Sequence, residues 1–222
     1  MLYKYLRADY ANRFVERGEI LFRTLSYFRS VEHAARGDEA EGVHIDAPDN
    51  DVTLTTNTGI RSVGRYRYLR SVNQDRVFAF CCSTELDARL FTAFDADACV
   101  VIHDLDTFLT RCKVAARTPL PLDPPGLVHG PVSYFAPNRA PLLDVSVSQN
   151  IPFLKHEGFS DQKEYRVVFA RRGGFTVTQR IVQPAFTFAE EIAVSRKFQR
   201  LLRLGDLSEI AEVVRSATSN GQ

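Results

Sequence analysis

The sequence predicts an α+β fold, with one domain over residues 1–222 built from two small, packed, mostly antiparallel sheets and flanking helices. Two observations lead to this class. Strand-like apolar runs outnumber helical patterns in the second half of the chain, so the regular alternation of a doubly wound parallel sheet is missing. Hydrophobic residues make up 45% of the chain and charged residues 25%, which is ordinary globular usage and argues against disorder.

The N-terminal residues predict a strand, a helix and a second strand. Residues 2–6 (LYKYL) form a short aromatic and aliphatic run that suits a strand. Residues 8–17 place apolar side chains at helical spacing, and Gly18 after them can end the helix. Residues 19–25 (EILFRTL) predict the second strand.

A helix and a loop are expected next. Residues 26–37 have helical spacing between Ser26, a suitable N-cap, and Gly37, a suitable stop. GDEAEG (37–42) is an acidic loop, for which we expect solvent exposure. It lacks the regular oxygen spacing of a calcium-binding loop. Residues 42–75 contain short alternating stretches.

The middle of the chain predicts buried strands. Residues 76–83 (RVFAFCCS) are nearly all apolar, which is typical of a strand covered on both faces. Residues 98–103 predict another such strand, and residues 104–112 a helix. TPLPLDPPG (118–126) is a proline-rich connection that we interpret as a surface loop, because neither half of the chain has an obvious core of its own.

The second half adds three strands, at residues 128–135, 163–170 and 175–182. Gly173-Gly174 lies between the last two, so a hairpin turn is expected there.

The C-terminal region is expected to be helical before it ends in a tail. FQRLLRL (198–204) and LSEIAEVVRSA (207–217) show helical spacing. Residues 215–222 are expected to form a polar, mobile tail.

Charge and cysteine content restrict the class of protein. The 28 basic residues nearly balance the 27 acidic ones, so attraction to nucleic acid or anionic membrane would have to be local. No apolar stretch approaches the roughly 20 residues that span a bilayer. The N-terminus does not look like a signal peptide, and the cysteines lack zinc-ligand spacing. We therefore expect a cytoplasmic protein with reduced thiols, at Cys81, Cys82, Cys99 and Cys112.

The strongest candidate for chemistry is SDQKEYR (160–166), where a polar cluster leads into an apolar strand. If the strand begins by residue 162, Gln162 and Glu164 point to the same face. Glu164, partly exposed in a cleft, can hold a sugar hydroxyl and stabilise positive charge on a ribose. Gln162 can bond an incoming nucleophile or a base edge. The alternative is that both residues form the solvated start of an amphipathic strand.

Two further segments supply groups that could accompany this cluster. Ser83 and Thr84 follow a buried run and would place two hydroxyls at the end of a central strand. Lys4, with Arg7 nearby, lies in or just after the first strand and can meet a phosphate or a ribose.

The order of a basic residue, a Ser-Thr pair and a [Gln/Glu]-x-Glu motif resembles the ADP-ribosyltransferase superfamily, which splits the nicotinamide–ribose bond of NAD. The resemblance implies that Glu164 is the catalytic carboxylate and that Gln162 orients the acceptor. It also implies NAD as substrate, no metal, and NAD contacts from Lys4, Arg7, Ser83 and Thr84. Lys4 stands where the family usually has Arg or His.

The same resemblance bears on partners. Gln at the first motif position occurs in superfamily members that modify guanine bases, so nucleic acid is implied as an acceptor beside protein. A toxin or defence role would add a cognate inhibitor protein. More of the chain, most of residues 2–170, resembles a bacterial domain family without an established activity, through LYKY, FRTLSYFRSVE and KHEGFSDQKEYRVV.

A magnesium-dependent nuclease is one alternative. Asp161 and Lys163 fit a D-x-K element, in which carboxylates hold Mg²⁺ and the lysine steadies the attacking water. Asp49 would supply the upstream acid. Other candidates for it are Asp38, Glu39 and Glu41.

A non-catalytic nucleic-acid-binding module is the other alternative. IRSVGRYRYLR (60–70) interleaves basic and aromatic residues, among them Arg65, Tyr66 and Arg67, which suits phosphate contact and base stacking. The competing interpretation is a solvated strand face with its aromatic rings turned inward.

Overall fold

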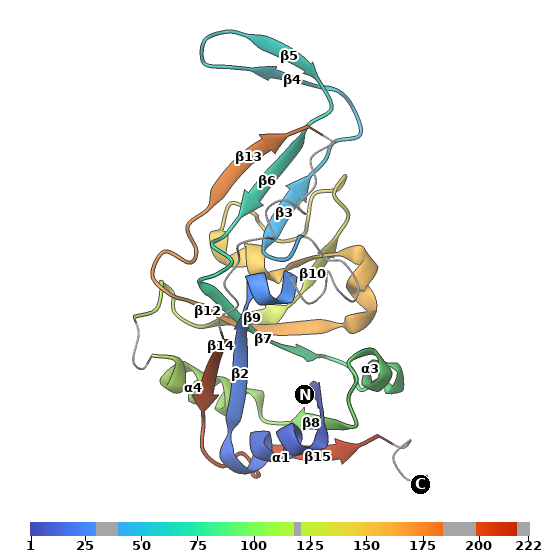
Figure 1. Ribbon diagram of the computed structural model, residues 1–222, viewed down its shortest axis with the longest axis vertical. Coiled ribbons are helices and arrows are strands. Elements are labelled where there is room, and N and C mark those ends of the chain that lie inside the picture. Colours follow the sequence, from blue (N-terminus) through green and yellow to red (C-terminus); the bar gives the residue numbers. More distant parts are fainter. Residues whose placement is uncertain (30–39, 118–120, 184–198, 217–222) are drawn as a thin grey trace.

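The computed structural model describes residues 1–29, 40–117, 121–183 and 199–216. Within them, most strands belong to one eight-stranded sheet in which every pairing is antiparallel (Figure 1). Its main path is β14 (Gln199–Arg203), β2 (Glu19–Thr24), β7 (Val77–Ser83), β1 (Leu2–Leu6), β8 (Ala98–Ile102) and β15 (Ala211–Arg215). Off this path, β12 (Glu164–Ala170) pairs with β7, and β9 (Val128–Pro131) pairs with β12.

The described residues form three smaller sheets in addition to the large one. The first joins β13 (Thr178–Val182), β6 (Arg67–Ser71) and β3 (Val43–Asp46). The second is the hairpin of β4 (Val52–Thr55) and β5 (Arg61–Gly64), which projects beyond the three-stranded sheet at the top of Figure 1. The third is a parallel pair, β10 (Ser133–Phe135) and β11 (Leu154–His156). The chain is thus a mixture of helices and mostly antiparallel sheets, with one large sheet and three smaller ones in place of the two small sheets expected.

The helices are short. They are α1 (Ala8–Arg17), α3 (Ala88–Ala93), α4 (Leu105–Ala116) and the 3₁₀ helices η1 (Ser148–Phe153) and η2 (Glu157–Gln162). Residues 25–29 are also helical, and the rest of the helix expected at 26–37 lies outside the described residues. None of the helices described has both the length and the apolar character needed to cross a membrane.

Phenylalanine builds the core between the large sheet and its helices. Phe14 of α1 stacks on Phe108 of α4, with 6.1 Å between ring centroids, and Phe80 of β7 packs against both. On the other face of β7 and β12, Val77, Ala79 and Val168 join a second apolar cluster. Both faces of these strands are therefore covered, which explains why their sequences are apolar almost without alternation.

The prediction of C-terminal helices was wrong. Residues 199–203 form β14 and residues 211–215 form β15, which pair with β2 and β8 along their full lengths. Both segments are short, and an isolated helix of this length is marginal, whereas an open sheet edge satisfies their backbone groups. Of the predicted tail, Arg215 ends β15, and residues 217–222 lie outside the described part.

The predicted hairpin through Gly173-Gly174 was also wrong, although a turn is present. Gly174 N–H donates to the carbonyl of Arg171 at 2.7 Å. However, β13 pairs with β6 and not with β12. β12 already has β7 on one side and β9 on the other, so it has no edge left for a following strand. The strand expected at 128–135 likewise divides, at Val132, into β9 and β10.

One side of β7 is shared by two strands that do not meet. β2 pairs with β7 at residues 78 and 79, and β1 pairs with it through Tyr3 and Ser83. Among the described strands, none pairs with β7 between these points on that side. The Lys4 ammonium group reaches into the gap and donates to the carbonyl of Cys81 at 2.7 Å. The large sheet is therefore open here between β1 and β2, and the candidate site described below lies at this opening.

Candidate functional site

A cavity of about 540 Å³ lies where β1 and β2 separate. Its polar and sulfur-bearing lining residues are Lys4, Arg23, Cys81, Cys82, Ser83, Asp95, Gln162, Glu164 and Arg166. Its aromatic lining residues are Tyr3, Tyr5, Tyr27, Phe28, Phe94 and Phe159. Such a combination of flat apolar surfaces and a few polar groups is typical of a small-molecule site.

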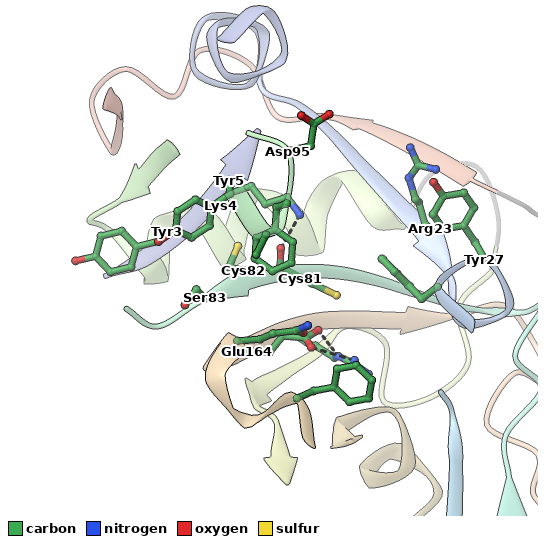
Figure 2. Close-up of a pocket in the computed structure, with 16 residues that line it drawn as sticks. Tyr3, Lys4, Tyr5, Arg23, Tyr27, Cys81, Cys82, Ser83, Asp95 and Glu164 are labelled. Atoms are coloured by element: carbon green, nitrogen blue, oxygen red, sulfur yellow. Dashed lines mark hydrogen bonds and ion pairs between the residues drawn. The ribbon is translucent and has the colours of Figure 1, made fainter. Parts of the chain in front are cut away.

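The strand register brings predicted site residues together. Ser83 is the direct partner of Glu164 in the β7–β12 pair, and Tyr3 of β1 is the partner of Ser83 on its other side. Directly paired residues project to the same face of a sheet, so all three side chains face the cavity. Figure 2 shows Tyr3 and Ser83 at one end of the pocket and Arg23 and Tyr27 at the other.

Glu164 is the centre of a buried ion cluster, so the expectation that it is partly exposed was wrong. Its side chain is only 6% exposed. One carboxylate oxygen accepts from Arg166 Nε at 2.6 Å. The other accepts from Lys155 Nζ at 3.1 Å and from Arg166 Nη2 at 3.2 Å. On its far side, Arg166 donates to both carboxylate oxygens of Glu41. Two cations and two carboxylates thus alternate in the cluster, and their charges sum to zero.

The cluster keeps Glu164 ionised. Burial alone would raise the pKa of this carboxyl, but attraction to Arg166 and Lys155 and a hydrogen bond from Arg166 outweigh it and hold the pKa well below its ordinary value. A carboxylate offers about four acceptor positions, and Lys155 and Arg166 fill three. A hydrogen bond from the Cys81 thiol also lowers this pKa. Since a thiol is a weak donor, a ligand hydroxyl can replace it.

Gln162 lies beside Glu164, but not because of strand alternation. β12 begins only at Glu164, and residues 157–162 form η2. Lys163 between them has φ +45°, in the left-handed region, which turns the chain sharply. Gln162 Oε1 accepts from Lys155 Nζ at 3.0 Å. An ammonium group only donates, so the bond to Lys155 does not use the amide NH₂ of Gln162, a residue that also lines the cavity.

Two predicted NAD-contacting residues lie away from this cavity. Thr84 is exposed, and its hydroxyl donates to the carbonyl of Lys163 at 3.1 Å. Arg7 forms a salt bridge with Asp95 and lines a neighbouring hollow. Lys4 does line the cavity, but one of its three N–H bonds is used on the Cys81 carbonyl.

The residues of the nuclease alternative are dispersed. Asp161 and Lys163 are exposed at the end of η2 and do not line the cavity. Asp49 accepts a hydrogen bond from Asn138 at 3.2 Å. Of the acids proposed to join it, Glu41 is held by Arg166, while Asp38 and Glu39 lie outside the described residues. Within the described ranges, no three His, Cys, Asp or Glu side chains gather as a metal-binding group.

The basic and aromatic segment, residues 60–70, runs from β5 of the projecting hairpin into β6 of the three-stranded sheet. Arg65 is exposed in the connection from β5 to β6, and Arg67 is half-buried opposite Val182 of β13. The Tyr66 ring packs against Gly64, and its hydroxyl lies 2.6 Å from Ser62 Oγ. None of these residues lines the cavity.

No role was predicted from the sequence for Lys155, Arg166 or Arg23, and Glu41 was expected in a solvent-exposed loop. Arg166 could have been found, because it lies two residues after Glu164 and so shares its face of the strand. Glu41 belongs to the loop expected to be solvated, yet it is only 1% exposed. Lys155 offered no comparable signal, since its position depends on the parallel pairing of β10 with β11. Comparison with known proteins adds no relative: no family model, no curated protein and no solved structure matches this chain.

Proposed function

We propose that this chain is an NAD-consuming enzyme of the ADP-ribosyltransferase type, with Glu164 as its catalytic carboxylate. The observation that carries the proposal is the pairing of Glu164 with Ser83 at the wall of the cavity, beside the aromatic rings of Tyr3 and Tyr5. A carboxylate and a hydroxyl on directly paired residues of neighbouring strands can hold the hydroxyls of one ribose, while a flat ring beside them can stack on nicotinamide.

The chemistry is a glycosyl transfer that requires no redox partner. The bond between ribose C1′ and the nicotinamide nitrogen breaks, and its electron pair leaves with neutral nicotinamide. Positive charge develops on the ribose, where the Glu164 carboxylate stabilises it and accepts a hydrogen bond from the 2′-hydroxyl in place of the Cys81 thiol. An acceptor nucleophile then forms the new bond to C1′ and releases its proton. With water as the nucleophile, the result is hydrolysis.

Gln162 is the residue proposed to orient the acceptor. Its amide NH₂ would donate a hydrogen bond to an oxygen or nitrogen atom of the molecule that receives ADP-ribose. Guanine presents two such atoms, O6 and N7, on one edge. We therefore favour a guanine-bearing nucleic acid as the acceptor, with protein as the alternative outcome of the experiment below.

Incubation with NAD labelled in its adenine ring tests the proposal, with mixed RNA, DNA and protein present and EDTA in one arm. We expect release of nicotinamide, label in the nucleic-acid fraction, and the same rates with EDTA. Glu164→Gln should abolish both hydrolysis and transfer, and Ser83→Ala should weaken both. Asp161→Asn, which changes an exposed acid outside the cavity, serves as the matched control and also removes the D-x-K element. Equal activity in Glu164→Gln and wild type would refute the assignment.

A further inference from the structure

The charges around the cavity do not cancel once its ion pairs are counted. Glu164 and Glu41 are balanced by Arg166 and Lys155. Asp95 at the rim is paired with Arg7. The two lining residues that remain are both cations, Lys4 and Arg23, and neither forms an ion pair with any described residue. The cavity therefore carries an excess of positive charge at its walls.

Arg23 is oriented to bind an anion. Its guanidinium carbon lies 3.9 Å from the centroid of the Tyr27 ring, which is a cation–π contact. Its N–H bonds lie in the plane of the guanidinium, and none of them has a hydrogen-bond acceptor among the described residues. A planar fork of donors held by an aromatic ring matches two oxygens of a phosphate group.

Lys4 can act with Arg23 from the other side of the opening in the sheet. Lys4 belongs to β1 and Arg23 to β2, the two strands that separate along β7. The Cys81 carbonyl takes one of the three N–H bonds of Lys4, so two remain. Figure 2 places Arg23 at the end of the pocket away from Ser83, with Lys4 between them. A ligand that extends from Ser83 toward Arg23 passes both cations.

We propose that Arg23, assisted by Lys4, binds the diphosphate of a nucleotide in this cavity, so that the ligand must be phosphorylated. The identification of the nucleotide as NAD rests on the proposed function, whereas the anion site does not. Contact with a phosphate or a ribose was expected of Lys4, with Arg7 nearby. This assignment keeps Lys4, adds Arg23 and leaves out Arg7, which pairs with Asp95. The Tyr27 ring, 3.9 Å from the guanidinium carbon, acts as a positioning group for Arg23.

Binding measurements without turnover test this site. Isothermal titration is performed with ADP-ribose, inorganic pyrophosphate, adenosine and the dicarboxylate malonate. Wild type should bind ADP-ribose and pyrophosphate, and Arg23→Gln should weaken both by about tenfold or more, because a charge-assisted bidentate contact is lost. Arg23→Lys should restore only part of the affinity. Arg13→Gln is the matched control, since Arg13 also lies over a tyrosine, Tyr10, but outside the cavity.

Each outcome decides the proposal separately from the proposed function. Unchanged affinity of Arg23→Gln for ADP-ribose, absence of binding of either phosphate probe to wild type, or tighter binding of malonate than of pyrophosphate overturns the diphosphate site. The first of these results leaves NAD cleavage by Glu164 untouched. Conversely, Arg23-dependent binding of ADP-ribose by a protein that does not cleave NAD retains the anion site and removes the enzyme assignment.

Discussion

Arg166 Nε donates to Glu164 Oε1 at 2.6 Å, although the two residues belong to the same strand and lie only two positions apart. The geometry of the strand brings these two side chains together, because residues i and i+2 project from the same face of a sheet. Both side chains are almost fully buried. The residue proposed for catalysis is therefore also part of the structure, and substitutions there must be tested for stability as well as for activity.

Glu164→Ala is expected to destabilise the fold. It leaves Lys155 and Arg166 facing each other without the carboxylate between them, and breaking a buried ion pair on one side costs about 3–5 kcal/mol. Glu164→Gln keeps the shape and one acceptor oxygen, so its loss should be smaller. Urea denaturation followed by circular dichroism measures both. Asp161→Ala, at an exposed position, should stay within about 0.5 kcal/mol of wild type. Equal stability of Glu164→Ala and wild type would contradict the buried cluster.

Acid should remove the contribution of Glu164. Its pKa is lower in the folded protein than the ordinary 4.5, so the folded state favours the ionised form. The resulting stabilisation is complete above the unfolded pKa and is lost as the pH falls below about 4.5 toward the folded pKa. The difference in unfolding free energy between wild type and Glu164→Gln should be constant near neutral pH and shrink below that point. A difference that grows in acid would contradict the sign of the shift.

The local hydrophobic pattern was sufficient to predict the helices and strands whose burial is uniform along their length. The apolar runs of β7 and β8 and the amphipathic pattern of α1 predicted those elements within one or two residues. β14 and β15 could not be predicted in this way, because their Leu and Val residues fit helical spacing equally well. Their strand state depends on the open edges of β2 and β8, which are distant in sequence.

The candidate site likewise has a part that could be predicted from the sequence and a part that could not. The placement of Ser83 and Glu164 at one cavity follows from two strands that the sequence revealed. The ion cluster does not, because Glu41 and Lys155 reach Arg166 and Glu164 from a loop and from a parallel pair that pattern cannot place. The low exposure of Glu164 is a consequence of those partners, and it therefore had no signature in the sequence.

Gln162→Ala separates transfer from hydrolysis. The Gln162 amide NH₂ is proposed to hold the acceptor, whereas cleavage of NAD depends on Glu164. The variant should therefore lose more transfer than hydrolysis, by about tenfold if one good hydrogen bond is lost in the transition state. Parallel assays of labelled nucleic acid and of released nicotinamide measure the two rates. Since Lys155 loses one acceptor in this variant, its thermal stability must be compared with wild type. An equal loss of both rates would assign Gln162 to positioning Lys155 alone.

The cysteines are expected to resist alkylation in the folded protein. Burial is the main cause that raises the pKa of Cys82, Cys99 and Cys112 to about 12. It also raises that of Cys81, together with the neighbouring Glu164 carboxylate. Because the thiolate is the reactive form, iodoacetamide at neutral pH should add to none of them in the native state and to all four after unfolding in urea. Mass spectrometry counts the adducts. Rapid modification of native Cys81 would show that a thiolate lies beside Glu164. It would contradict the proposal that a neutral Cys81 thiol donates to Glu164 and is replaced by a ribose hydroxyl.

Gly18 joins the end of α1 to β2, the strand that carries Arg23. It has φ +60°, and a Cβ atom there would lie 2.2 Å from the carbonyl oxygen of Gly205. Gly205 itself has φ +76°, but a Cβ added to it would meet nothing within 4 Å. Gly205→Ala should therefore cost only the left-handed backbone penalty of about 1–2 kcal/mol, and Gly18→Ala should cost clearly more, because the chain after β14 must move away. Denaturant unfolding of the two variants gives the comparison. If Gly18→Ala is no less stable than Gly205→Ala, the close approach of these two segments at the start of β2 is wrong.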